Sequence, residues 1–448
     1  MEHDLDRFTA RYRSHFTSRT RSCVKAAEAY FAGLAQARKR NMERIAEVVP
    51  DADDQRLQHF VSYSPWDHRE VIDHVARDAD RLLGGSPNTC LIVDESGFPK
   101  KGDRSVGVAR QWCGRLGKVE NCQVGVFAAL ARDGEVTLTD ARLYLPKAWA
   151  EDSARCKRAK VPEAERGYRT KPELALEMVR HARRLGVEFA WVGADSFYGA
   201  DPKFLRGLDA DGEVFVVDVK ASQRIYLEDP RPQVPPRRSA RGRAPQRPRA
   251  QGPEPIRVDA WVRNQPGEAW RRLSYRDSTK GPLWVEVLHR RVWVWDGRES
   301  KAHCWHLIVR RSVRNPGEIK YTLSNAPEQT SVRRLAYMQG QRYWVERSLQ
   351  EAKSEVGMAE YQVRLWQGWH HHMAMVLMAL LFLLEARRKH RGAFPLLSAR
   401  DVREVLSVLL PRANATLEDA LAQMARRHRR RASAMASHTR KANQSQAL

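Results

Sequence analysis

Short apolar runs bounded by turn residues constrain the fold of this chain more than any other feature. The first run, residues 89–93 (TCLIV), is rich in β-branched residues, and similar runs follow at residues 123–130, 136–145, 189–192 and 213–219. Between the third and fourth of these five runs, apolar residues recur at helical spacing from Leu174 to Ala182. Strands interrupted by helices in this order are typical of a mixed sheet. We therefore expect an α/β fold.

The charge of the chain predicts a polyanionic partner. Lys and Arg number 78 against 54 Asp and Glu, which gives a net charge of +24, and the excess is spread along the chain. A membrane surface is the weaker alternative, because the longest apolar run, residues 373–384, is shorter than the roughly 20 residues that span a bilayer. We expect that run to be a buried helix and the partner to be nucleic acid.

The first residues (MEHDLDRF) are charged and lack the basic start and apolar stretch of a signal peptide. The sequence therefore predicts a cytoplasmic protein.

Five parts are predicted along the chain. Residues 1–84 read as a basic, helical, DNA-binding N-terminal region, and residues 85–225 as the first part of the α/β core. Residues 226–330 should contain a linker and a β-rich insertion, residues 331–395 the helices that complete the core, and residues 396–448 a basic helical tail.

The predicted insertion has two distinct halves. Residues 229–255 are rich in Pro and Arg, a composition that cannot bury a core, so we expect a flexible basic linker. Strand-like alternation (LWVEVLHRRVWVWDG) follows, with six of the 13 tryptophans: Trp261, Trp270, Trp284, Trp293, Trp295 and Trp305. Core packing is the expected role of most of them.

Three carboxylates form the candidate site. Asp94 directly follows TCLIV and Asp195 directly follows FAWVGA, so each is predicted to lie where a strand ends, the usual ligand position in α/β sheets. Such an Asp alone is often only a turn cap. Arg342, Glu346 and Lys353, however, are spaced by four and seven residues on one predicted helical face. Together these residues suit a divalent cation and phosphate groups.

Neighbouring polar residues are expected to stay outside this site. Glu95 follows Asp94 and should point to the opposite face of the strand. His370, His371 and His372 are consecutive on a helix, where side chains diverge by about 100°, so they cannot converge on one metal ion. We interpret them as helix-surface or DNA-contacting groups.

These motifs resemble those of the DDE transposases of bacterial insertion sequences, specifically the insertion sequence 701 group, whose third acid lies in an R(3)E(6)K signature. Arg342, Glu346 and Lys353 match that signature, while Gln339 stands where its longer form has Tyr. The resemblance covers roughly residues 5–390. It includes VDESGFPKKGDRSVGVARQWCGRLGKVENCQVGVF around Asp94, GADSFYG around Asp195, TKGP at residues 279–282 and EAKSEVGMAEYQVRLWQGWHHHMAM after Glu346.

The resemblance implies an RNase H-like core with a β-rich insertion between the second Asp and the Glu. It implies that Asp94, Asp195 and Glu346 are the catalytic residues and the ligands of two Mg²⁺ ions, for which Mn²⁺ can substitute. The expected activity is metal-dependent cleavage at the ends of an insertion sequence and strand transfer to target DNA. No GxxxxGK[ST] loop is present, which fits a reaction without nucleotide hydrolysis.

Basic residues are expected to bind double-stranded DNA, both the terminal inverted repeats and the target. Arg342 and Lys353 would hold phosphates near the metal ions, and Lys100 and Lys101, in the loop beside Asp94, would do the same. The resemblance further implies a homodimer in a synaptic complex, a nucleoid-associated location in a bacterium, and a tryptophan of the insertion that stacks on a flipped base.

Two alternatives remain open. A non-catalytic DNA-binding regulator derived from a transposase would be expected to have lost an acid, and all three are present. A structure-selective nuclease of RNase H type without strand transfer would not call for the basic N-terminal helices or the long β insertion.

Overall fold

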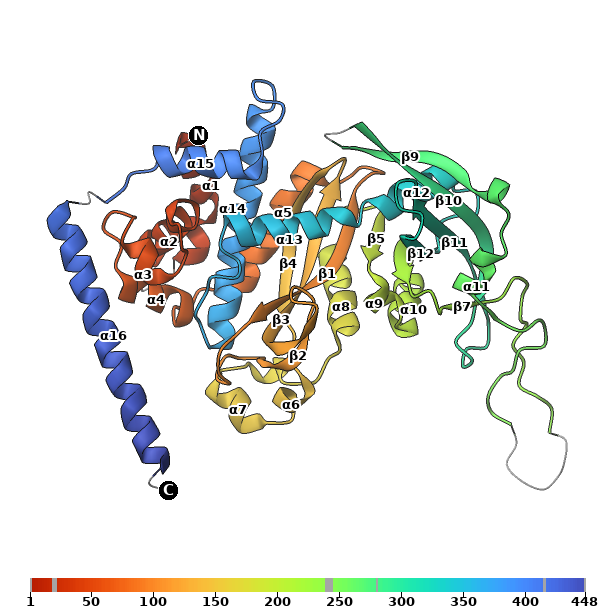
Figure 1. Cartoon of the computed structure of the whole chain (residues 1–448), viewed down its shortest axis with the longest axis horizontal. Coiled ribbons are helices and arrows are strands. Elements are labelled where there is room, and N and C mark those ends of the chain that lie inside the picture. The colour runs from red at the N-terminus through yellow and green to blue at the C-terminus, as the bar shows by residue number, and fades with distance from the viewer. Residues whose placement is uncertain (1, 18–21, 238–244, 279–280, 414–415, 447–448) are drawn as a thin grey trace.

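One large sheet organises the protein (Figure 1). The computed structural model describes residues 2–17, 22–237, 245–278, 281–413 and 416–446. Part of the Pro/Arg-rich linker, and Thr279 and Lys280 of the TKGP motif, therefore lie outside the described residues. The sheet has ten strands, with helices on both faces, which confirms the predicted α/β class.

The N-terminal region is helical, as predicted, and it packs on the body of the protein. Its helices are α1 (Glu2–Tyr12), α2 (Val24–Gln36), α3 (Met42–Ala46), α4 (Asp54–Ser62) and α5 (His68–Leu83). Phe8 of α1 contacts both Phe31 of α2 and Phe382 of the later helix α14 (Trp366–His390), with ring centroids 5.8 and 5.3 Å apart. These aromatic contacts bury the apolar faces of the N-terminal helices against the core.

The core half of the sheet contains the strands predicted from the apolar runs. They are β1 (Cys90–Pro99), β3 (Lys118–Arg132), β4 (Glu135–Leu143), β5 (Trp191–Ala194) and β6 (Phe215–Val219). β1, β5 and β6 run parallel, whereas β3 is antiparallel to both β1 and β4. The spatial order β4-β3-β1-β5-β6 is consistent with an RNase H-like core.

The connections in the core are mostly helical. The short strand β2 (Ala109–Cys113) pairs with the start of β3, a pairing that the sequence did not indicate. Between β4 and β5 lie α6 (Lys147–Ala150), α7 (Ser153–Arg158) and the crossover helix α8 (Lys171–Arg184), and between β5 and β6 lie α9 (Ser196–Gly199) and α10 (Pro202–Ala210). Thr170 begins α8 with a capping box that it forms with Glu173.

The β-rich insertion extends the same sheet. Its elements are β7 (Arg224–Ile225), β8 (Ile256–Arg257), α11 (Val258–Arg263), β9 (Arg271–Ser278), β10 (Gly281–Val294), β11 (His303–Ser312) and β12 (Ile319–Ser324). β12 pairs antiparallel with β6 and continues through β11 and β10 to β9. Pairing with β12 covers the edge of β6, which would otherwise expose unpaired backbone groups. Trp261 and Trp305 are buried as expected, while Trp284 is 46% exposed.

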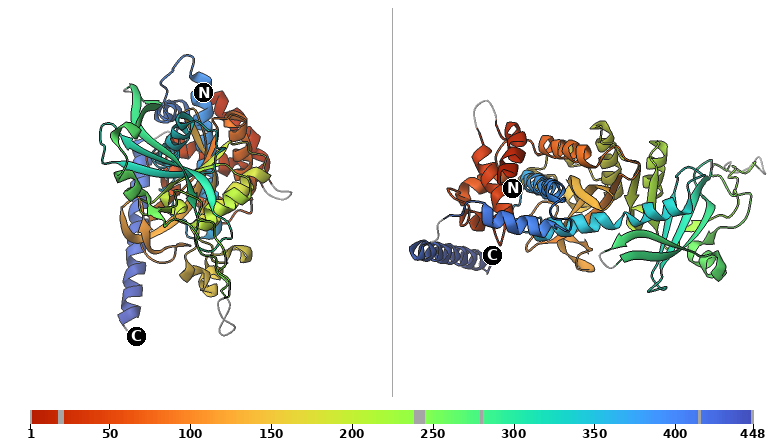
Figure 2. Two further views of the ribbon diagram at one scale, coloured as in Figure 1. Left: turned by 90° about the vertical axis from the view of Figure 1, so that its right-hand side faces the viewer. Right: turned by 90° about the horizontal axis from the view of Figure 1, so that it is seen from above.

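Long helices complete the structure: α12 (Val332–Gly340), α13 (Tyr343–Glu355), α14, α15 (Ala399–Leu409) and α16 (Leu417–Gln446). α13 crosses one face of the sheet, and α5 and α8 lie on the other (Figure 2). Among the described helices, only α14 is long and apolar enough to cross a membrane. Its apolar stretch is almost entirely buried inside the protein, as predicted for residues 373–384, so α14 is a core helix.

The interpretation of the three consecutive histidines as surface or DNA-contacting groups is wrong. All three side chains are buried, because α14 is surrounded by protein on every side. The two ring nitrogens of His371 each lie 2.9 Å from a backbone oxygen, that of Val61 and that of Trp66, and the neutral ring donates to one of them. His372 lies 2.8 Å from the hydroxyl of Tyr30, which can donate to it or accept from it.

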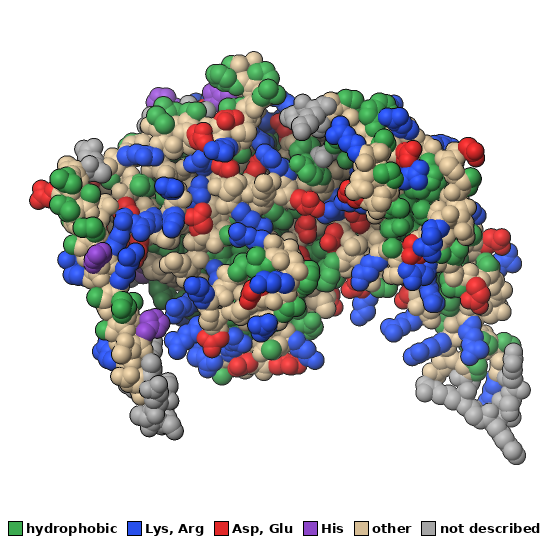
Figure 3. Space-filling view, in the orientation of Figure 1, with side chains coloured by type: hydrophobic (Ala, Val, Ile, Leu, Met, Phe, Trp, Pro, Cys, Tyr) green, Lys and Arg blue, Asp and Glu red, His purple; other side chains and the backbone are tan. Residues whose placement is uncertain are grey.

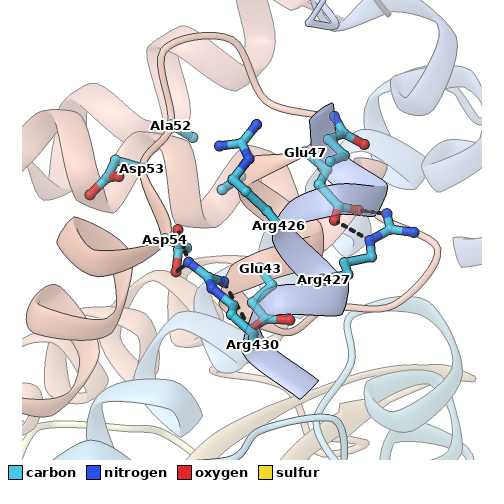
Figure 4. Close-up of a pocket in the computed structure, with 10 residues that line it drawn as sticks. Glu43, Glu47, Ala52, Asp53, Asp54, Arg426, Arg427 and Arg430 are labelled. Carbon is cyan, nitrogen blue, oxygen red and sulfur yellow. Dashed lines mark hydrogen bonds and ion pairs between the residues drawn. The ribbon is translucent and has the colours of Figure 1, made fainter. Parts of the chain in front are cut away.

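The C-terminal helix α16 is long and rich in arginine, and it extends away from the rest of the protein (Figures 1 and 2). Ion pairs with the N-terminal helices hold its first half (Figure 4). Arg427 donates to both carboxylate oxygens of Glu47 at 2.9 and 2.6 Å, and Arg430 donates to Glu43 and Asp54, each at 2.9 Å. The contact is ionic and partly exposed, so salt should weaken it.

Candidate active site

Asp94 lies in the middle of β1, so the prediction that this residue follows the end of its strand is wrong. β1 continues to Pro99 because its pairing with β3 extends that far. Its parallel pairing with β5 stops earlier, where Ile92 lies beside Gly193. Continued by two residues, the same register places Asp94 level with Asp195. The two acids therefore share the end of the parallel pair, although only one of them ends a strand.

Asp195 directly follows β5 and begins α9. Its Oδ1 accepts hydrogen bonds from the backbone N–H groups of Phe197 and Tyr198, at 2.9 and 3.4 Å. This N-cap fixes the direction of the carboxylate. The GADSFYG motif thus gives a strand end, a capping acid and a short helix in seven residues.

The surroundings of Asp94 disfavour its negative charge. Burial raises the pKa of the Asp94 carboxyl to about 7, and the charge of Asp195 acts in the same direction, while the nearby Arg342 opposes them. Two carboxylates that face each other in a buried site repel, and a cation between them would relieve the repulsion.

α13 brings the third predicted acid to the rim of the site. Arg342 precedes the helix, and its Nη2 donates to Oε1 of Glu346 at 2.6 Å. The same guanidinium places Nη1 3.9 Å from Oδ2 of Asp94. The Glu346 side chain is 51% exposed, against 14% for Asp94. Glu346 therefore lies on the solvent side of Asp94, and Arg342 contacts both carboxylates.

A fourth carboxylate, Asp218 on β6, was not predicted. Its Oδ2 lies 3.2 Å from Nε of Arg342, and its Oδ1 accepts a hydrogen bond from Thr322 Oγ1 at 2.5 Å. Gln339, at the position of the signature Tyr, is buried and donates to the same Thr322 hydroxyl at 2.6 Å. An acid inside the apolar run EVFVVDV was the available signal. Asp218, Thr322 and Gln339 form a chain of contacts that ends at Arg342.

The charge balance at Arg342 follows from these contacts. Burial alone would lower the pKa of the guanidinium, but the carboxylates of Asp218 and Glu346 outweigh that effect and raise it. Arg342 is thus a permanently charged group held by acids on two different elements.

The predicted lysines occupy different environments. Lys353 faces the site from α13, where burial lowers the pKa of its ammonium group and the charge of Asp94 acts to raise it. Lys100 donates to the backbone oxygen of Tyr361 at 3.1 Å and lies 3.4 Å from the centre of that ring. Burial lowers the pKa of Lys100 to about 8. Lys101 is exposed.

Glu95 points away from the site, as the alternation of a strand predicts. Its carboxylate pairs with Lys171 of α8 at 2.8 Å, on the face of the sheet opposite α13. This arrangement leaves Asp94 as the acid of β1 that faces Arg342.

The donor set fits a hard divalent cation. Within the described ranges, no three His, Cys, Asp or Glu side chains are gathered closely enough to hold a metal ion. The Glu346 carboxylate contacts Arg342 instead of the aspartates. Carboxylate oxygens are nevertheless the ligands that Mg²⁺ prefers, and a bound cation would stabilise the ionised form of Asp94 that burial and Asp195 disfavour.

Comparisons with known proteins identify the family. A family model described as DDE superfamily endonuclease matches residues 11–282. The chain belongs to this family. A curated relative, the "Probable transposase for insertion sequence element IS701" of Microchaete diplosiphon, is 25% identical to this DDE endonuclease over 331 residues, which are 74% of each chain. The resemblance to the insertion sequence 701 group is thereby confirmed.

Among solved structures, the NurA nuclease from Sulfolobus solfataricus matches 74% of this DDE endonuclease and 95% of its own chain, at 9% sequence identity. Its TM-score of 0.22 is too low to support an argument about fold or function.

Proposed function

We propose that this DDE endonuclease is a transposase that cleaves the ends of an insertion sequence and joins them to target DNA by a cut-and-paste route. The observation that carries the proposal is the position of Asp94 and Asp195 just beyond the parallel pairing of β1 with β5, with Glu346 held nearby by Arg342. Each step would be an in-line displacement at phosphorus: water or a 3′-hydroxyl attacks, and a DNA 3′-oxygen leaves.

Asp94, Asp195 and Glu346 would hold two Mg²⁺ ions, with Mn²⁺ as a substitute. Such ions, when bound, supply Lewis-acid stabilisation of the charge that develops on the attacking and leaving oxygens. The site needs this positive charge because burial and the nearby Asp195 disfavour the ionised form of Asp94. Movement of the Glu346 carboxylate from Arg342 towards the aspartates would complete the ligand set.

Arg342 and Lys353 would contact the phosphates next to the scissile bond. Both lie on the face of the sheet that carries Asp94, and Asp218 fixes the guanidinium of Arg342 from the other side. Lys101, which is exposed in the loop after β1, would contact a further phosphate. Lys100 would first have to leave its contact with Tyr361.

The proposed partners are the terminal inverted repeats and the target DNA, both double-stranded. The net charge of +24 supports a polyanionic partner. A homodimer would hold the two ends in a synaptic complex in the bacterial cytoplasm, at the nucleoid. Trp284, the most exposed tryptophan of the insertion, is the candidate for stacking on a flipped base.

The test compares wild type with Glu346→Gln on DNA that carries the element's own ends, with Mg²⁺ or Mn²⁺. We expect wild type to cut and join, and the variant to bind the DNA with similar affinity but to do neither. Glu404→Gln is the matched control, since Glu404 also forms an i,i+4 pair with an arginine, on α15. If wild type binds authentic ends and never cuts them, the non-catalytic regulator is the better interpretation.

A further inference from the structure

A basic cavity lies away from the candidate catalytic acids. Its volume is about 530 Å³. Three segments that are distant in the sequence line it: the loop after β1, the helices α6 and α7, and the residues directly before α14. The lining residues are Asp103, Arg104, Trp149, Arg155, Arg158, Ala159, Arg364 and Leu365.

Hydrogen bonds between the three segments fix the shape of the cavity. The backbone N–H of Val106 donates to the backbone oxygen of Arg364 at 2.9 Å, and that of Trp366 donates to Ala159 at 3.0 Å. The buried indole of Trp149 donates to the backbone oxygen of Val108 at 2.8 Å. The arginines are therefore carried by a rigid frame and not by a loose surface loop.

The four arginines of the cavity share its lining with a single carboxylate, that of Asp103. Arg155 stacks on Trp149, 3.8 Å from the ring centre, and donates to the backbone oxygen of Asp103 at 2.8 Å. Arg104, Arg158 and Arg364 are exposed, and none of them forms an ion pair with any described residue. Like charges held together on one frame repel, so an anionic occupant would stabilise the arrangement.

We propose that this cavity binds the phosphodiester backbone of DNA outside the cleaved bond. The inference rests on the proposed function and adds a second contact site to it. A planar guanidinium group can donate two parallel hydrogen bonds to the oxygens of one phosphate. Stacking on Trp149 fixes the position of the Arg155 guanidinium. The part of β1 from Asp94 to Pro99 is roughly 16 Å long, and the loop that lines the cavity follows it. Figure 3 shows Lys and Arg side chains gathered over the lobe that contains α6 and α7.

The test is a triple variant, Arg104→Ala with Arg158→Ala and Arg364→Ala, which leaves Arg155 and the frame intact. Binding of a 40-base-pair duplex is measured by fluorescence anisotropy from 50 to 300 mM salt. Each lost phosphate contact should reduce the slope of log K against log salt by about 0.9, so we expect a reduction of about 2–3. The corresponding triple Lys variant keeps the charge and should keep the slope.

The matched control removes three arginines that are paired with carboxylates, Arg180, Arg257 and Arg400. It has the same change in net charge and should keep most of the slope. An unchanged slope in the cavity variant, or an equal loss in the control, would overturn the proposal. So would cavity-dependent binding of inorganic phosphate, measured by calorimetry, without any change in DNA binding.

A cleavage arm separates this inference from the proposed function. At protein concentrations that saturate the DNA, the cavity variant should still cut, because its catalytic acids are intact. If the slope falls and neither protein cuts, the cavity stands and the proposed catalysis fails. If both proteins cut with equal salt dependence, the cavity fails and the catalysis stands.

Discussion

Replacing Gly199 by alanine tests whether close packing of α9 against β6 positions the candidate catalytic acids. Gly199 ends α9, four residues after Asp195, and its added methyl carbon would lie 2.0 Å from the backbone oxygen of Asp218. A second contact, with Cγ1 of Val217, would be at 3.0 Å. Because backbone cannot rotate away as a side chain can, α9 and β6 would have to separate by about 1.4 Å to restore ordinary contact.

That separation has a cost in stability and a cost in rate. Overpacking of this kind lowers the free energy of unfolding by about 1–3 kcal/mol, and we expect the upper half of that range. α9 is capped by Asp195, so the shift also moves one acid relative to Asp94. A misplacement of about 1 Å reduces a catalytic rate by roughly 100-fold.

The assay pairs urea unfolding, followed by tryptophan fluorescence, with cleavage of element-end DNA. Gly167→Ala is the matched control, since an added methyl group there meets no atom within 4 Å and the backbone is not in the left-handed region. The control should change the free energy of unfolding by less than about 1 kcal/mol and leave cleavage unaltered. Wild-type stability and rate in Gly199→Ala would refute the packing argument.

Three further predictions follow from individual contacts. Asp218→Asn should reduce the cleavage rate about tenfold, because the guanidinium of Arg342 would lose its ion pair with Asp218 and be held less firmly. DNA affinity and melting temperature should change little, and a variant that cuts at the wild-type rate would contradict this role. Burial lowers the pKa of His371 and His372 from 6.5 to about 4, so the unfolded chain binds more protons below pH 6.5. The free energy of unfolding should therefore fall as pH drops from 6.5 to 4, by on the order of 3 kcal/mol per histidine. Urea titrations at pH 7.5, 5.5 and 4.5 test this, and an unchanged free energy of unfolding over these pH values would contradict it. Arg430→Ala should speed hydrogen exchange in the first half of α16 without altering exchange in the sheet, and equal exchange in both proteins would mean that the ion pairs do not hold the helix.

Local pattern was sufficient for much of the fold. Each of the apolar runs after residue 88 overlaps a strand, and the helical spacing from Leu174 to Ala182 lies within α8. The same logic placed Asp195 correctly, since its strand has only four residues and ends directly before it. It failed for Asp94, because the length of β1 is set by pairing with β3, which the run TCLIV alone does not reveal.

Contacts between distant segments could not be predicted in this way. The histidines of α14 looked polar enough for a surface, but the helix is enclosed by the N-terminal helices, which supply carbonyl and hydroxyl partners from residues more than 300 positions away. Asp218 was missed for a related reason: its partners Thr322 and Arg342 come from the insertion and from the end of the core. The pairing of β12 with β6 places Thr322 beside Asp218, and the start of α13 adds Arg342.

The most direct test of the central claim, that the acids form one metal-dependent site, is a single-turnover measurement of cleavage. Asp94→Asn, Asp195→Asn and the double variant are compared with wild type at saturating DNA and Mg²⁺. When two residues act in one site, removing either abolishes its function. The cleavage rate of each single variant should therefore be at least about 10³-fold below wild type, and that of the double variant hardly lower. A single variant within about tenfold of wild type, or losses that multiply in the double variant, would contradict the account.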